Sequence, residues 1–268
     1  MSDIISQMFQ FPFMIRALIA GGLIALVAAL IGVCLVLKRF SMIGDGLSHV
    51  GFSALAIASV LGFAPLVIAI PVVIVAAFFL LRLSDKDSLK GDAAIALVST
   101  SALAIGVIVL SLTTGMTTDV NNYMFGSILS MSKSDAVVGV VVSIIMLIIF
   151  VWFYNRVFVV TFDEPFASAT GIRADKYRIV ISVMTAVVIV MGLRLVGAML
   201  ISGFLIFPGL SAMRICKSYK AVTIAAAVIS LVCFFVGLVC SFAFALPTGA
   251  SIILINLIVF IICSLFRK

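Results

Sequence analysis

Asp45 and His49 are the residues of this sequence best suited to chemistry. They stand four positions apart in the apolar stretch KRFSMIGDGLSHVGFSALAIASVLGF, residues 38–63, and His49 is the only histidine in the chain. Residues at this spacing lie on one face of a helix, so the carboxylate and the imidazole can reach a common point. A charged side chain at mid-bilayer costs about 2.5–3.5 kcal/mol on insertion scales, so such groups are retained mainly where they act inside a bundle.

Three roles for this pair stay open on residue chemistry alone. The two side chains can lock the bundle by hydrogen bonding, relay protons, or coordinate a divalent transition metal through carboxylate oxygen and imidazole nitrogen. A tetrahedral zinc site needs about four ligands, and one chain supplies two of them here. A symmetric dimer with the pair facing its axis would supply all four.

Several enzyme classes are excluded by the motifs that the sequence lacks. A single histidine rules out an H-E-x-x-H metalloprotease, and the chain contains neither a G-x-x-x-x-G-K-[ST] phosphate loop nor a G-x-S-x-G nucleophile elbow. We therefore do not expect this chain to bind ATP by that route or to catalyse hydrolysis.

The composition places these residues in a membrane. Of 268 residues, 65% are hydrophobic and 10% are charged, and the mean hydropathy is +1.44; soluble domains are about 45–50% apolar and about 25% charged. The apolar runs are continuous, which favours helices over barrel strands. We predict an all-α, polytopic transmembrane bundle of eight to nine spans forming one domain, residues 1–268. The candidate spans are 14–37, 42–62, 64–83, 93–113, 135–155, 178–193, 195–215, 221–245 and 248–266.

The net charge of +7 follows from basic residues in alternate loops. Such asymmetry marks the cytoplasmic side, so we expect a cytoplasmic C-terminus and no nucleic-acid partner, and with nine spans the N-terminus would be external. The longest predicted cytoplasmic connection, residues 156–177, is the expected docking site for a partner. The basic groups are Lys38 and Arg39; Arg82, Lys86 and Lys90; Arg156, Arg173, Lys176 and Arg178; Arg214, Lys217 and Lys220; and Arg267 and Lys268.

A short helix is predicted within that connection, in the segment FDEPFASATG. Asp163 suits an N-cap, Pro165 suits the first turn, and Gly171 suits the far end. Phe166 and Ala167 would then be available to insert into a partner's groove, although a surface helix without a partner fits the same local pattern.

Five segments, taken in order, resemble the membrane permeases of bacterial ATP-binding-cassette importers for zinc, manganese or iron. They resemble the early helix with its aspartate and histidine, a YLFG-like segment, the ATPase-engaging loop, a proline-containing span and the start of the last helix. Gly46 and Gly209 stand where alanine is usual in the family, and both changes keep small side chains. The segments are RFSMIGDGLSHVGFSALAIA, NNYMFGSILSMSKSD, FDEPFASATGIRADKYRIV, LRLVGAMLISGFLIFPGLSAM and LPTGASIIL.

The resemblance implies a homodimeric pore in the bacterial inner membrane, two ATPase subunits on its cytoplasmic face, and an extracytoplasmic delivery protein that docks near 114–134, 194 and 246–248. The cargo would be Zn²⁺, Mn²⁺ or Fe²⁺ passing Asp45 and His49, with no covalently bound cofactor. ATP would be hydrolysed in the partner subunits, so the chain is expected to be a transport subunit and not an enzyme. The ATPase-coupling residues would be Asp163, Glu164, Phe166, Ala167 and Gly171.

An alternative is a proton-coupled secondary metal carrier that needs no ATPase. It predicts gradient-driven uptake by this chain alone, whereas an assembly protein would not need Asp45 or His49. Co-purification with an ATPase subunit would favour the importer over both.

Overall fold

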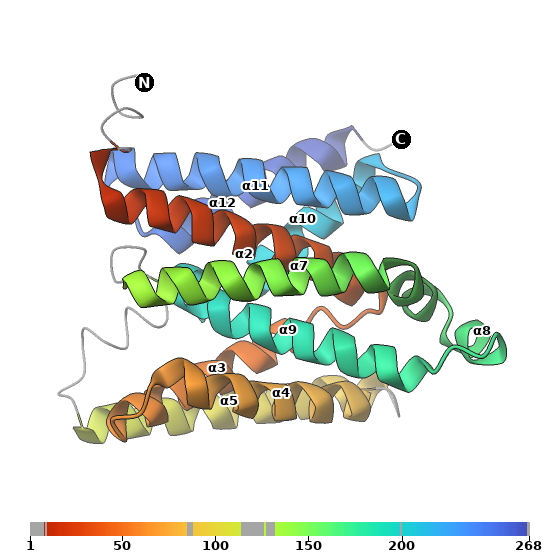
Figure 1. Ribbon diagram of the computed structural model, residues 1–268, viewed down its shortest axis with the longest axis horizontal. Helices are drawn as coiled ribbons and strands as arrows, with labels where there is room; N and C mark the ends of the chain where they lie inside the picture. The colour runs from red at the N-terminus through yellow and green to blue at the C-terminus, as the bar shows by residue number, and fades with distance from the viewer. Residues whose placement is uncertain are drawn as a thin grey trace.

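Helices account for all the regular structure in the part of the chain that the computed structural model describes, namely residues 8, 10–84, 88–113, 126, 132–198 and 200–266 (Figure 1). The predicted all-α class is confirmed. The helices are α2 (Pro12–Leu37), α3 (Ile43–Val60), α4 (Pro65–Ser84), α5 (Ser88–Thr113), α7 (Lys133–Phe162), α8 (Glu164–Ala169), α9 (Ala174–Val196), α10 (Ile201–Ile215), α11 (Tyr219–Phe244) and α12 (Thr248–Leu265).

Each predicted span overlaps one of these helices. Within the described residues, seven helices are long and apolar enough to cross a membrane, and two apolar helical stretches, Pro65–Leu80 of α4 and Ile201–Ile215, are shorter. The number of segments that cross the bilayer therefore stays a prediction of eight to nine.

The break between two of the predicted spans lies later than expected. The sequence suggested a division at Arg194, but α9 continues to Val196 and ends at Gly197, whose φ is 90°. Such a backbone conformation is open to glycine and strained for other residues, so the glycine sets the boundary and the arginine does not.

The helices are arranged in adjacent groups (Figure 1). Helices α3, α4 and α5 lie together on one side, α7 and α9 run through the middle, and α2, α10, α11 and α12 lie on the other side. Short α8 projects at one end, where α7 ends, α9 begins and the α10–α11 turn lies. We call this the basic end, because Arg156, Arg173 and Lys217 belong to its turns and helix ends.

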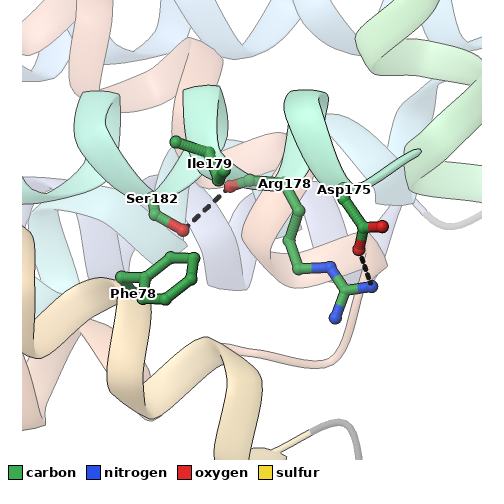
Figure 2. A pocket seen from close by; sticks show the side chains of 5 residues that line it. All are labelled: Phe78, Asp175, Arg178, Ile179 and Ser182. Atoms are coloured by element: carbon green, nitrogen blue, oxygen red, sulfur yellow. Dashed lines mark hydrogen bonds and ion pairs between the residues drawn. The ribbon is translucent and has the colours of Figure 1, made fainter. Parts of the chain in front are cut away.

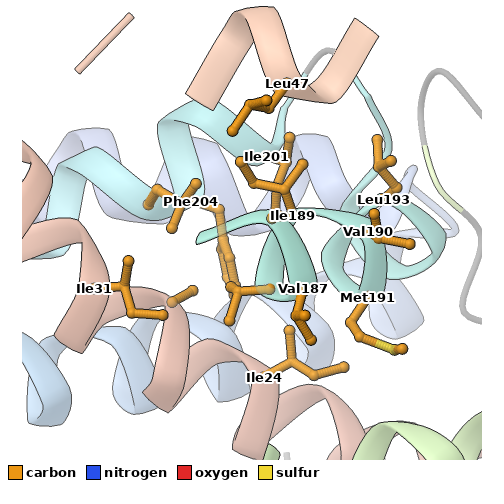
Figure 3. Close-up of a cluster of buried hydrophobic side chains, with 14 of the residues drawn as sticks. Ile24, Ile31, Leu47, Val187, Ile189, Val190, Met191, Leu193, Ile201 and Phe204 are labelled. Carbon is orange, nitrogen blue, oxygen red and sulfur yellow. The ribbon is translucent and has the colours of Figure 1, made fainter. Parts of the chain in front are cut away.

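Helix α9 connects the two sides of the bundle. Near the basic end, Phe78 of α4 lies beside Ile179 and Ser182 of α9, where they line a pocket of about 290 Å³ (Figure 2). Farther along, α9 carries the centre of the apolar core, and Ile189 there is fully buried. Side chains from α2, α3, α9 and α10 meet at this point (Figure 3).

Close approach of α2 and α10 completes the core. A Cβ at Gly32 would collide with the backbone carbonyl of Leu205, so the two helix backbones touch there. Small residues allow such contacts between membrane helices, which associate through packing and interhelical hydrogen bonds. Ser230 of α11 adds one of these bonds, donating to the Ala25 carbonyl of α2 at 2.8 Å.

The outer faces of the bundle are apolar. On α7, Ile148 is 58% and Trp152 is 79% exposed. A water-facing helix would carry polar residues at such positions, whereas lipid is the expected surrounding of an exposed apolar row.

Candidate metal path and coupling site

Helix α3 holds Asp45 in its first turn, just after the turn that ends α2. Arg39 adopts a φ of 61° in that turn, and α3 begins at Ile43. An acidic side chain at a helix N-terminus interacts favourably with the helix dipole. The Ser48 hydroxyl donates to the Asp45 backbone carbonyl at 2.7 Å, so this hydrogen bond does not involve the Asp45 carboxylate.

The structure brings Asp45 and His49 together as their spacing predicts. His49 Nε2 lies 3.8 Å from Asp45 Oδ1, and the side chains are 12% and 36% exposed, respectively. This distance exceeds that of a hydrogen bond. His49 Nδ1 is buried and has no hydrogen-bond partner among the described residues. The two side chains therefore share one face of α3 without a hydrogen bond between them.

One chain offers two ligands at this position. No group of three or more His, Cys, Asp or Glu side chains suited to a metal ion occurs within the described ranges. The pair therefore fits part of a metal site, and a complete ligand set would need groups from elsewhere.

Neighbouring helices hold α3 firmly in place. A Cβ at Gly51 would lie 2.5 Å from Leu193 Cδ1 of α9, and Ser53 donates a hydrogen bond to the Ala102 carbonyl of α5. These contacts with two different helices fix the rotation of α3 about its axis, and with it the direction of the Asp45–His49 face.

The predicted short helix forms as α8. Asp163 is its N-cap and accepts a hydrogen bond from the Phe166 backbone N–H at 2.9 Å. Pro165 lies in the first turn, and Gly171 follows the helix with a φ of 82°. The structure therefore confirms the predicted short helix and the residues predicted at both of its ends.

The two residues expected to contact a partner are placed differently. Phe166 is 57% exposed, whereas Ala167 is fully buried in a small cluster with Val160 and Ala174. In this conformation Ala167 contacts α7 and α9 of its own chain and is closed to a partner. Ala167 packs α8 against α7 and α9. Phe166 is therefore the accessible member of the pair.

Glu164 joins three helices. Its carboxylate accepts from Lys38 Nζ, at the end of α2, at 3.3 Å, and from an Arg178 guanidinium nitrogen of α9 at 2.6 Å. Arg178 also contacts Asp175 at 3.3 Å (Figure 2). Sequence reasoning had assigned Lys38 and Arg178 only to the basic loops. The sequence signal that could have indicated these ion pairs is a single acidic residue, Glu164, at the start of a short helix in a region rich in cations.

Part of the expected docking surface for a delivery protein lies outside the described residues. This applies to 114–125 and 127–131 and to the side chain of Arg194. The turn at 246–248 is described, and Ser241 donates to the Leu246 carbonyl there at 2.7 Å.

Comparisons with known proteins match almost the whole chain. The model of the ABC 3 transport family matches residues 10–267. The manganese import system permease protein ScaB of Streptococcus gordonii is 27% identical over 97% of this chain and 93% of its own length. The high-affinity zinc uptake system membrane protein ZnuB of Haemophilus influenzae is 25% identical over 97% of this chain and 99% of its own.

A solved structure supports the same relationship. The structure of PsaBC from Streptococcus pneumoniae in complex with Fab matches with a TM-score of 0.88 and 27% identity, covering 98% of this chain and 94% of that one.

Proposed function

Because this chain belongs to the ABC 3 transport family and is similar to manganese and zinc permeases throughout its length, we propose that it forms the membrane path of an ATP-driven importer of Mn²⁺ or Zn²⁺. The family makes it a transport subunit of the permease type. The names of the two relatives refer to manganese and zinc, and neither refers to iron.

The Asp45–His49 pair is the observation that carries the proposed path. An imidazole nitrogen that is buried and unbonded is suited to accept a metal ion, and a carboxylate 3.8 Å from the other ring nitrogen adds negative charge. The 36% exposure of Asp45 leaves it open to a ligand from outside this chain. We propose that a second copy of the chain contributes an equivalent pair to the ion path.

Coupling to an ATPase is proposed to pass through α8. Exposed Phe166 would contact the ATPase subunit, and Glu164 ties α8 to Lys38 at the end of α2. Only a short turn separates Lys38 from α3, which carries the Asp45–His49 pair. A displacement of α8 would therefore be transmitted to the start of α3 through one ion pair and one turn.

Metal uptake by the complete transporter tests the proposed path. We expect Asp45→Asn and His49→Gln each to lower uptake at least about tenfold, as changes at metal sites commonly do. Ser48→Ala is the matched control, because it changes a neighbouring polar residue whose hydroxyl bonds only the backbone. Undiminished uptake in both site variants would refute the path. Gradient-driven uptake by this chain alone in proteoliposomes would favour the secondary carrier.

Association with the ATPase subunit tests the proposed coupling. Phe166→Ala should weaken co-purification of the ATPase without lowering thermal stability, since the side chain is 57% exposed. Phe266→Ala is the matched control, because Phe266 is 73% exposed and directly follows α12, away from α8 in the chain. Equal weakening by both changes would mean that α8 has no special part in the contact.

A further inference from the structure

A second polar feature lies apart from the proposed metal path, where α7 ends and α9 begins. It is a pocket of about 340 Å³ lined by Arg156, Arg173, Lys176 and Tyr177 together with residues 170–172. We call it the basic pocket. Its described lining contains three cations and no carboxylate, unlike the adjoining hollow, which includes Glu164 and Asp175. Such a lining is complementary to an anion.

Arg156 is held in position by an aromatic pair. One of its guanidinium nitrogens donates to the Tyr177 hydroxyl at 2.8 Å, and its Cζ lies 6.0 Å from the centre of the Tyr177 ring. Phe153 packs edge-on against the same ring, with 5.7 Å between centroids. This hydrogen bond uses one of five guanidinium N–H donors. The others suit the planar, multiple hydrogen bonding by which arginine binds phosphate.

The start of α9 adds to the positive potential of the basic pocket. Arg173 is the N-cap of α9, and its side chain makes no capping hydrogen bond; the one acidic residue of the first turn is Asp175, whose side chain is 92% exposed. Phosphate groups bind readily at the N-termini of helices. Here the helix end supplements a pocket that already contains three cationic side chains.

The position of the basic pocket along α7 indicates the source of the phosphate. Trp152, 79% exposed, precedes Arg156 by one helical turn, and Ile148 continues the same row at 58% exposure. Exposed tryptophan is typical of the level where lipid headgroups begin. An apolar row that leads directly into a cationic pocket matches a molecule with an acyl chain and an anionic head.

We propose that the basic pocket binds the phosphate group of an anionic phospholipid, with the acyl chain lying along the exposed row of α7. Arg156, Arg173 and Lys176 would contact the headgroup, and Tyr177 would keep the Arg156 guanidinium facing it. Basic pockets between membrane helices bind anionic headgroups in this manner. The proposed site involves neither Asp45 nor His49, so its test does not depend on the outcome of the tests of the metal path.

Lipid binding by the purified full chain tests this proposal. Phosphatidylglycerol and phosphatidylcholine would be titrated in turn into detergent-solubilised protein, and bound lipid would be counted by native mass spectrometry. Removing two cations near a headgroup is expected to weaken phosphatidylglycerol binding about 30-fold in Arg156→Gln/Lys176→Gln. Lys217→Gln/Lys220→Gln removes the same charge from exposed positions at the same end and should change binding less than about threefold.

A second variant tests the proposal even if the double variant does not fold. Tyr177→Phe keeps the ring and all three cations but removes the hydroxyl that accepts from Arg156, so a smaller loss of phosphatidylglycerol binding is expected. Equal weakening by both double variants would overturn the proposal, because it would show non-specific attraction.

Two further results would also overturn it. Inorganic phosphate binding as tightly as phosphatidylglycerol would identify a site for free anions. Unchanged lipid binding with lost ATPase association in Arg156→Gln/Lys176→Gln would assign the basic pocket to an acidic protein surface.

Discussion

Replacing Glu164 by glutamine should loosen α8 while leaving the rest of the bundle intact. The change keeps the shape of the side chain and removes the charge that attracts Lys38 and Arg178. A hydrogen bond to a charged group contributes about 1.5–3 kcal/mol net. Because the Glu164 side chain is 30% exposed, solvent screening reduces the contribution toward the lower end of that range.

The two partners are affected unequally. Arg178 retains its contact with Asp175, whereas the Lys38 side chain, only 9% exposed, loses the carboxylate that compensates its charge. We therefore expect the free energy of local opening of α8 to fall by about 2 kcal/mol, which corresponds to roughly 30-fold faster amide exchange where reclosing is faster than the chemical exchange step.

Hydrogen exchange of the α8 amides measures this change directly. The relevant donors include the backbone N–H groups of Ala167, Thr170 and Ile172, each bonded within the α8 segment. Asp175→Asn makes the same chemical change on another contact of Arg178, but Asp175 is 92% exposed, so exchange should rise no more than about threefold. Equal exchange in the Glu164→Gln and Asp175→Asn variants would refute the idea that Glu164 anchors α8.

Two further predictions concern contacts between helices, and both can be measured as thermal stability of the purified chain. Gly32→Ala should destabilise the protein by about 1–3 kcal/mol, because its Cβ would collide with the Leu205 carbonyl; Gly22→Ala, whose Cβ would meet only a Leu231 methyl at 3.9 Å, should be tolerated. Ser230→Ala should cost about 0.6 kcal/mol and at most about 1.7 kcal/mol, since it removes one interhelical bond to α2. A larger loss for Gly22→Ala than for Gly32→Ala would contradict the packing of α2 against α10.

Local patterns were sufficient for the features that depend on neighbours in the chain. The spacing of Asp45 and His49 placed them on one helical face, and Asp163 and Gly171 marked the two ends of α8. In each case the physical cause acts within about one or two helical turns, through side-chain spacing, capping or backbone conformation.

Features that depend on distant contacts could not be predicted in the same way. Glu164 and Lys38 lie 126 positions apart, and nothing in the charge pattern selects this partner from the other cations of the basic loops. The burial of Ala167 likewise depends on how α7 and α9 meet. The boundary predicted at Arg194 lies too early, because α9 ends only at Gly197, whose backbone freedom allows the chain to leave the helix.

The short length of α10 has a consequence for how this helix is held in the membrane. Its 15 residues rise only about 22 Å, less than the hydrocarbon core of about 30 Å, and Pro208 interrupts its hydrogen bonding. The preceding backbone at Gly197 and Ala198 is buried by protein. A short, proline-interrupted segment of this kind gains less from lipid than a full span does, so we expect α10 to depend on its packing against α2, α11 and α12 for its place in the membrane.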